Sequence, residues 1–405
     1  MFRTKCLICY SKNINNIMDL GMHPFADTFI PISKIHLSEK IYPLVVQLCD
    51  KCGNVQLGCE TDAESRYQEN DYSYTSSNSN YSINYWLQYA NEILKFFPKN
   101  IKLKILEIGS NDGLLLSILK KKNHNVLGVD ASPVMNKLAK KKNIETRLGI
   151  FDEQYSNKIS NEFGNFDLII ANNVFNHAND PQSFFMGIKN LLKKDGIFTF
   201  ESPYWLNSIK SGKFDQIYHE HVTYLTAKSV KKLSSLNNLY ISDITFSYYH
   251  GGSIRFMVCK NKKKENLDKI IKIISKENQS NLYSPIFYEK FMKKIKQKKN
   301  KFMEKIFSNK NNSKPLICIG AAAKANTFLN FYGLNNNLVN HITDASKNKI
   351  GKFTPLTRIP ITSDIIIKNY KKPNIIFTAW NVSDNLKKII YKINSKVTEL
   401  KPYED

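Results

Sequence analysis

The stretch Glu107-Ile108-Gly109-Ser110-Asn111-Asp112-Gly113 decides the fold of this 405-residue chain. It follows an apolar run that predicts a strand at residues 104–108 and precedes a pattern typical of a helix at residues 114–121. Glycine has no Cβ, so a turn that contains glycines lets the backbone approach a ligand closely. A strand, a glycine turn and a helix in this order are typical of a parallel α/β domain that binds a nucleotide.

Strand and helix patterns continue to alternate after this turn. Further strands are predicted at residues 125–130, 145–148, 166–171 and 196–201, and a helix at residues 181–192. Two more strand patterns, at residues 241–246 and 253–259, are expected to add an antiparallel edge. The alternation predicts a parallel α/β sheet.

The spacing of the glycines indicates which nucleotide the turn receives. Gly109 and Gly113 are separated by three residues and Glu107 precedes them, whereas a dinucleotide turn carries three glycines for a pyrophosphate. Asp130 ends the next strand, where a carboxylate can accept hydrogen bonds from both ribose hydroxyls of an adenosine. The combination favours a cofactor without phosphate, and S-adenosylmethionine fits it. In the alternative interpretation, the glycines only terminate a strand.

Four of the seven cysteines form two pairs with equal spacing, Cys6-x-x-Cys9 and Cys49-x-x-Cys52. Each pair suits a tight turn that directs two thiolates to one ion, and two such turns complete a tetrahedral zinc site. Four sulfur ligands leave no position open for water, so a structural role is predicted. Chance placement or a redox pair is the alternative.

The chain is too long for one ordinary core, and its patterns divide it into three predicted domains. Residues 1–65 are expected to bind zinc, residues 66–262 to form the cofactor-binding domain, and residues 263–405 to form a second, Rossmann-like α/β domain. In the last of these, a lysine-rich helical stretch at residues 266–308 precedes strands at residues 316–320, 340–344 and 374–379. Residues 67–80 are polar and rich in Tyr and Ser, which predicts a mobile loop or a lid over a ligand.

The formal net charge of +24 could serve nucleic acid, an anionic membrane or a phosphorylated substrate. The lysine clusters carry no interleaved aromatic residues and mostly follow helical patterns, which favours solvated helix faces. No apolar run approaches the roughly 18 residues of a membrane span, and residues 1–6 lack the apolar core of a signal peptide. We therefore expect a cytoplasmic monomer with no nucleic-acid partner and no membrane partner.

Tyr218-His219-Glu220-His221 is a titratable cluster without the spacing of a metal site, and it lies just past the last predicted parallel strand. Histidine titrates near neutral pH, so the cluster suits proton transfer. In the alternative interpretation, it is a hydrogen-bonded knot that supports a loop.

Several motifs, specific only in combination, occur in one order along the chain. They are Cys6-x-x-Cys9, Asp19-Leu20-Gly21-Met22-His23-Pro24-Phe25-Ala26-Asp27, Cys49-x-x-Cys52-Gly53, Glu107 to Gly113, Ala171-Asn172-Asn173-Val174-Phe175-Asn176-His177, Phe214-Asp215-Gln216-Ile217-Tyr218-His219-Glu220-His221, His250-Gly251-Gly252-Ser253-Ile254-Arg255 and Gly320-Ala321-Ala322-Ala323-Lys324-Ala325-Asn326-Thr327. In these motifs the chain resembles the nucleotide-sugar C-methyltransferases, which include the hexose 3-C-methyltransferases, over nearly its whole length. The resemblance implies a class I S-adenosylmethionine-dependent methyltransferase with a seven-stranded Rossmann-like sheet, an N-terminal zinc-binding segment and a C-terminal Rossmann-like domain.

The resemblance also implies the reaction, which is methyl transfer to the carbon next to the ketone of a nucleotide-linked, dTDP-type 4-keto-deoxyhexose. That carbon must first lose a proton, and the enolate oxygen must be held by donors. By match to the family motifs, His221 is the base and Glu220 supports it, while Tyr218, His177 and Tyr72 surround the reacting carbon. His219 is expected to take no part.

The same match assigns binding residues. Those expected at the cofactor are Glu107, Gly109, Asn111, Gly113, Asp130, Phe151, Asn172 and Asn173, with Phe151 near the adenine. Lys324 and Asn326, in a turn that opens a helix, are expected to hold the diphosphate of the nucleotide-sugar. Ala322 replaces the proline of the commoner family pattern, which predicts a less rigid turn.

Two other functions fit the sequence. A sugar O-methyltransferase for a surface glycan would use the same cofactor fold, because the fold does not determine the acceptor atom. A zinc-containing nucleic-acid-binding protein would use the charge of +24 and would bind with a steep salt dependence. The absence of a basic-aromatic platform counts against the second function.

Overall fold

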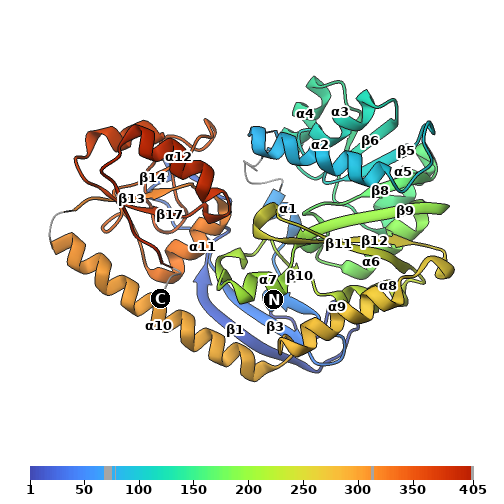
Figure 1. The fold of residues 1–405 in the computed structure, drawn as a ribbon, viewed down its shortest axis with the longest axis horizontal. Coiled ribbons are helices and arrows are strands. Elements are labelled where there is room, and N and C mark those ends of the chain that lie inside the picture. Colours follow the sequence, from blue (N-terminus) through green and yellow to red (C-terminus); the bar gives the residue numbers. More distant parts are fainter. Residues whose placement is uncertain (68–74, 78, 312–313, 403–405) are drawn as a thin grey trace.

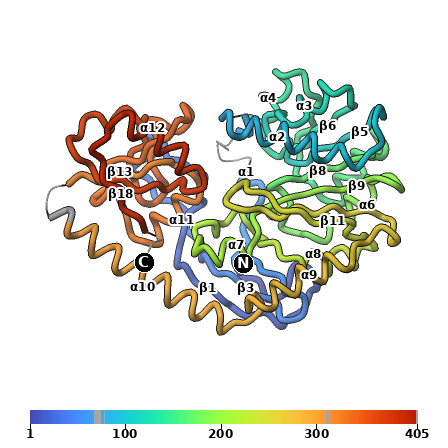
Figure 2. The backbone as a smooth tube through the Cα atoms, viewed as in Figure 1, coloured from blue at the N-terminus to red at the C-terminus, as the bar shows by residue number. Residues whose placement is uncertain are grey.

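In a computed structural model that describes residues 1–67, 75–77, 79–311 and 314–402, the chain forms four β-sheets. Figure 1 shows two α/β units side by side, the larger drawn in cyan to yellow and the smaller in orange to red. The N-terminal strands lie beneath and between them, and the long helix α10 (Pro285–Asn311) runs below the smaller unit toward these strands. The tube in Figure 2 follows the same arrangement of the backbone.

The central sheet has seven strands in the spatial order β11-β12-β9-β8-β5-β6-β7. They are β5 (Lys104–Ile108), β6 (Asn125–Asp130), β7 (Thr146–Leu148), β8 (Phe166–Ile170), β9 (Leu192–Pro203), β11 (Tyr240–Ser247) and β12 (Ser253–Cys259). Strands β5 to β9 pair in parallel, whereas β12 runs antiparallel to both β9 and β11. The predicted parallel sheet with an antiparallel edge is confirmed.

Helices cover both faces of this sheet. Successive residues of β5 pack into different hydrophobic cores, one on each face of the sheet. Ile105 packs with Tyr89 of α2 (Asn80–Leu94), and Leu106 belongs to the cluster that contains Phe185 of α6 (Pro181–Leu191). The helices of this part of the chain are α2 (Asn80–Leu94), α3 (Leu114–Lys121), α4 (Pro133–Lys141), α5 (Glu153–Phe163), α6 (Pro181–Leu191), α7 (Trp205–Lys210) and α8 (Ala227–Leu236).

The N-terminal sheet is antiparallel and includes a strand from far along the chain. Its order is β1 (Ile14–His23), β3 (Tyr42–Cys49), β4 (Val55–Leu57) and β10 (Thr223–Tyr224), and the short helix α1 (Ala63–Tyr67) follows β4. Because β10 begins two residues after His221, the sheet that carries Cys49 also holds one end of the titratable cluster.

The C-terminal sheet has five parallel strands in the order β16-β14-β13-β17-β18. They are β13 (Leu316–Ile319), β14 (His341–Thr343), β16 (Ile361–Thr362), β17 (Asn374–Phe377) and β18 (Thr398–Glu399), with helices α11 (Ala323–Tyr332) and α12 (Ser383–Ile393). The lysine-rich stretch forms α9 (Leu267–Gln279) and α10. A two-stranded sheet of β2 (Ile30–Pro31) and β15 (Lys352–Phe353) joins the N-terminal and C-terminal parts.

None of the helices in the described ranges combines the length and the apolar character that crossing a membrane requires.

Candidate active site

A cavity of about 290 Å³ lies where β5, β6 and β8 end. Ligands of parallel α/β sheets bind outside the carboxyl ends of the strands, so this is the expected place for a cofactor. Its lining includes Gly109, Asn111, Asp130, Ser132, Phe151, Asn172, Asn173, Trp86, His177 and His250. Six of the eight residues predicted at the cofactor thus share one cavity, whereas Glu107 and Gly113 are not among its lining residues.

The two predicted glycines act differently. Gly109 has φ +68°, and a Cβ there would lie 2.1 Å from Cγ2 of Val174. Gly113 has φ +75° at the start of α3, and its Cβ would lie 3.1 Å from Cβ of Ala139 on α4. Gly109 therefore shapes the cavity wall, while Gly113 allows α3 to begin and to pack on α4.

Asp130 fixes the glycine turn. Its Oδ2 accepts a hydrogen bond from the backbone N–H of Asn111 and its Oδ1 accepts one from that of Ser132, both at 2.8 Å. Burial raises the pKa of Asp130 to about 6. Each carboxylate oxygen can accept a second bond, so Asp130 keeps the capacity to bind two ribose hydroxyls.

Buried polar atoms without partners test the fit of S-adenosylmethionine. Among the described residues, Trp86 Nε1, Asn172 Nδ2 and Glu107 Oε2 are buried and make no hydrogen bond. Burial, together with the charges of Asp130 and Asp112, raises the pKa of Glu107 well above its usual range. The two N–H donors of Trp86 and Asn172 suit a carboxylate. The amino acid end of S-adenosylmethionine carries a carboxylate, so the lining residues fit this cofactor.

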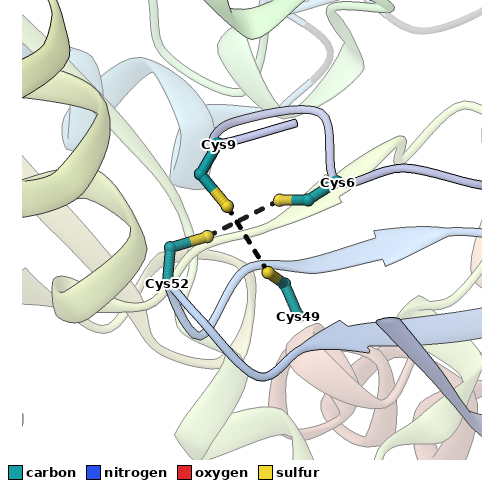
Figure 3. A group of neighbouring side chains, drawn as sticks. All are labelled: Cys6, Cys9, Cys49 and Cys52. Carbon is teal, nitrogen blue, oxygen red and sulfur yellow. Dashed lines mark hydrogen bonds between the residues drawn. The ribbon is translucent and has the colours of Figure 1, made fainter. Parts of the chain in front are cut away.

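The four predicted zinc ligands come together. Figure 3 shows their sulfur atoms facing one another, with 3.5 Å between Cys6 and Cys52 and 3.6 Å between Cys9 and Cys49. All four sulfurs lie within 4.8 Å of one another. Tetrahedral zinc with bonds of about 2.3 Å holds its sulfurs about 3.8 Å apart, so the set fits one structural zinc ion.

Tyr218 to His221 form a tight turn, closed by a 2.9 Å hydrogen bond from the His221 N–H to the Tyr218 carbonyl. The hydroxyl of Tyr218 lies 2.7 Å from Nε2 of His221, and Nδ1 of His221 lies 2.9 Å from the backbone carbonyl of Gln216. A carbonyl can only accept, so the neutral ring carries its hydrogen on Nδ1. The Tyr218 hydroxyl must then donate to Nε2.

The other two residues of the turn point elsewhere. His219 packs edge-on against Tyr42, and its Nε2 lies 3.3 Å from the carbonyl of Pro43. Oε1 of Glu220 accepts hydrogen bonds from the backbone N–H groups of Ala26 and Asp27, each at 3.1 Å. In the described part of the chain, Glu220 therefore bonds to the N-terminal segment and not to His221, so its predicted support of His221 is not a direct hydrogen bond.

His177 links the cavity to this turn. It lies on η2 (Phe175–His177), lines the cavity, and its ring centre is 5.1 Å from that of His221. Burial and the nearby His221 lower the pKa of His177 well below its usual range, and burial lowers the pKa of His221 to about 4. Both rings are thus neutral near pH 7. Tyr72, predicted beside them, lies outside the described residues.

Arg66 of α1 is a site residue that the sequence interpretation missed. Its Nη1 donates to the carbonyls of His177 at 3.4 Å and of His219 and Glu220 at 3.5 Å, and its Nη2 donates to Asn179 at 2.6 Å. These bonds hold η2 against the turn of residues Tyr218 to His221. No local sequence pattern around Arg66 indicates this role, because these four partners are all more than 100 residues away.

Lys324 approaches the site from the C-terminal unit. Its Nζ donates to Oδ1 of Asn381 at 2.8 Å and lies 4.5 Å from the centre of the Trp380 ring. Burial lowers the pKa of Lys324 to about 8, and its charge in turn contributes to lowering the pKa of His221. A half-buried cation at this place suits an anionic group of a ligand.

Asn326, the other predicted substrate residue, is buried against the N-terminal segment. Its Nδ2 donates to the carbonyl of Ala26, and the neighbouring Thr327 donates to the carbonyl of Ile217 at 2.8 Å. These bonds dock α11 on the N-terminal segment and on Ile217, the residue before the Tyr218–His221 turn. In this arrangement Asn326 ties segments together, and it does not line the described cavity.

Three protein families match the chain in sequence order. Residues 6–67 match the family described as "Putative zinc binding domain", residues 83–243 match "Methyltransferase domain", and residues 248–400 match "C-methyltransferase C-terminal domain". The chain is an S-adenosylmethionine-dependent methyltransferase. In this methyltransferase the cavity at the end of β5 lies where parallel α/β sheets bind their ligands.

Several named proteins are similar to this chain. C-methyltransferase NovU of Streptomyces niveus is 24% identical over 387 residues, which are 94% of this chain and 91% of that protein. A ubiquinone biosynthesis O-methyltransferase of Coxiella burnetii is 24% identical over 176 residues, 39% of this chain and 73% of that one. Among solved structures, magnesium protoporphyrin IX methyltransferase of Synechocystis PCC 6803 is 14% identical, with 45% of this chain and 88% of that chain covered and a TM-score of 0.37.

Proposed function

We propose that the enzyme methylates the carbon next to the ketone of a nucleotide-linked 4-keto-deoxyhexose, with dTDP as the nucleotide part. The observation that carries the proposal is the neutral Tyr218–His221 pair, which His177 connects to the cofactor cavity. A carbon acid needs a base beside the methyl donor, and this pair supplies one. Similarity to a C-methyltransferase over 94% of the chain supports the same reaction.

The pair can accept the proton in a balanced relay. The Tyr218 oxygen takes the proton from the carbon while the hydroxyl hydrogen of Tyr218 passes to Nε2 of His221. The Nδ1–H group of His221 remains hydrogen-bonded to the Gln216 carbonyl. The substrate is left as an enolate and His221 as an imidazolium. S-adenosylmethionine, when bound, supplies an electrophilic methyl group. Glu220 and Arg66 act through the position of the turn that carries the pair.

Lys324 links the nucleotide part of the substrate to the strength of the base. Its ammonium lies close enough to contribute to lowering the pKa of His221, after burial. A diphosphate bound at Lys324 would offset this charge and so raise the pKa of His221. A substrate without the diphosphate should therefore react more slowly even when it is saturating.

Purified enzyme should transfer a methyl group from S-adenosylmethionine to at least one member of a panel of 4-keto-deoxyhexoses linked to dTDP or to other nucleotides. NMR of the product would identify the methylated carbon. Failure of every panel member to gain a methyl group would refute the proposal.

The second candidate is a sugar O-methyltransferase for a surface glycan, which the similarity to a ubiquinone biosynthesis O-methyltransferase over 39% of the chain favours. Deuterium placed on the carbon next to the ketone decides between the two. Methylation of that carbon must remove the label, whereas methylation of an oxygen leaves it in place.

A further inference from the structure

His250 faces the same cavity as His177 but has no assigned role. It lies on η4 (Tyr249–Gly251), which connects β11 and β12, and its backbone has φ 53° and ψ 25°. A residue with a side chain rarely adopts a positive φ. Such conformations persist where the surroundings impose them, and they concentrate at functional sites.

Contacts from three parts of the chain impose this conformation. Gln216, beside the catalytic turn, donates from Nε2 to the His250 carbonyl at 3.2 Å. Tyr249 stacks on Tyr85 of α2, with 4.0 Å between ring centres. Trp380 of the C-terminal unit occupies the space next to Gly251, where a Cβ would lie 2.5 Å from the indole ring. The position of His250 therefore depends on all three.

Burial and the nearby cation of Lys324 keep the ring of His250 neutral. Burial, then the charges of Lys324 and His221, lowers the pKa of His250 to about 3. A neutral imidazole retains one N–H donor. The cation of Lys324 is near enough to favour negative charge beside that donor.

The proposed enolate needs a donor that the catalytic turn does not offer. The Tyr218 hydroxyl donates to Nε2 of His221, and Nδ1–H of His221 donates to Gln216. The hydroxyl hydrogen of Tyr218 and the Nδ1 hydrogen of His221 are therefore already in hydrogen bonds before the substrate binds. An enolate oxygen held by donors placed in advance is stabilised strongly, since the site then needs no reorganisation.

We infer that His250 donates a hydrogen bond to the ketone oxygen of the substrate and holds that oxygen as it becomes the enolate, with Lys324 balancing the charge. The inference rests on the proposed function. As the proton leaves the carbon for the Tyr218–His221 pair, the electron pair of the broken C–H bond moves toward the oxygen that His250 holds. They return to the carbon when the new carbon–carbon bond forms and the sulfur of the methyl donor leaves.

The variants His250→Gly and His250→Asn test this role. Glycine keeps the backbone conformation and removes the side chain, whereas asparagine tolerates a positive φ and retains an amide donor. Asn238→Gly, at an exposed position that also has φ 53°, is the matched control. The readouts are exchange of the substrate C–H with D₂O in the absence of cofactor, methyl transfer, and cofactor affinity by calorimetry.

His250→Gly should slow both deuterium exchange and methyl transfer by about 10²-fold, the usual cost of one lost oxyanion donor. Cofactor affinity should stay within about threefold, and His250→Asn should regain part of both rates. Unchanged exchange in His250→Gly, or a tenfold loss of cofactor affinity, would overturn the inference alone. Absence of exchange in the unmodified enzyme with every keto sugar would overturn the proposed function together with the inference.

Discussion

The Tyr218 hydroxyl lies 2.7 Å from Nε2 of His221, while Nδ1 of the same ring is held by the Gln216 carbonyl at 2.9 Å. The two contacts select one tautomer, because the carbonyl requires a hydrogen on Nδ1. A base whose accepting nitrogen is covered by a phenol can take a proton from carbon only through that phenol or after the phenol moves. In the proposed relay, Tyr218 is thus as important to proton transfer as His221.

Tyr218→Phe should lower the rates of both deuterium exchange and methyl transfer by about 10²-fold or more, the usual contribution of a positioned base. His221→Ala should lower both rates at least as much. Calorimetry should show unchanged cofactor affinity. Tyr370→Phe is a matched control, because the Tyr370 hydroxyl lies 3.0 Å from Nε2 of His341 in the C-terminal unit. A loss of less than tenfold in either site variant would rule out this relay.

Loss of zinc should disturb catalysis as well as stability. Cys49 ends β3, and the adjacent β4 pairs with β10, which follows His221. Cys49→Ser should reduce the bound zinc measured by atomic absorption, lower the thermal midpoint by about 5 °C or more, and slow methyl transfer. Cys59→Ser removes another buried thiol outside the cluster and should keep the zinc. Full zinc occupancy in Cys49→Ser would contradict the assignment of this ligand.

Gly109→Ala should weaken cofactor binding by about tenfold or more, which corresponds to about 1.4 kcal/mol, because its Cβ would collide with Val174. Gly212→Ala carries the same backbone strain at φ +69° but meets nothing within 4 Å, so it should bind normally. Adding Val174→Ala to Gly109→Ala should restore part of the affinity. Equal affinities in the two glycine variants would show that the collision does not matter.

The pH dependence of kcat/KM should report Lys324. Burial lowers the pKa of Lys324 to about 8, Asp215 raises it, Lys213 lowers it, and the rings of His221 and His250 also face this charge. The ammonium exists below its pKa, so binding of an anionic substrate should hold below about pH 8 and fall above it. Lys324→Arg keeps its charge and should remove that fall, whereas Lys324→Met should bind weakly at every pH. A fall that persists unchanged in Lys324→Arg would assign it to another group.

The cofactor half of the site could be predicted because its residues stand next to the elements that position them. Gly109 and Asp130 each lie within a residue of the end of an adjacent strand, and parallel strands bring such ends together. Glu220 illustrates the opposite case, because its partners Ala26 and Asp27 are more than 190 residues away. Arg66 and Trp380 likewise depend on partners that are distant in sequence.

The sequence by itself determined the parallel sheet, its glycine turn and the two cysteine pairs, because periodicity and spacing act between neighbours along the chain. It also singled out Tyr218 and His221 as a titratable cluster. Only the tertiary structure decided that the turn directs the Tyr218 hydroxyl to Nε2 of His221, and that Lys324 and His250 approach the same place. Such contacts join segments whose distance in sequence carries no information about their distance in space, so they exist only once the packed units bring them together.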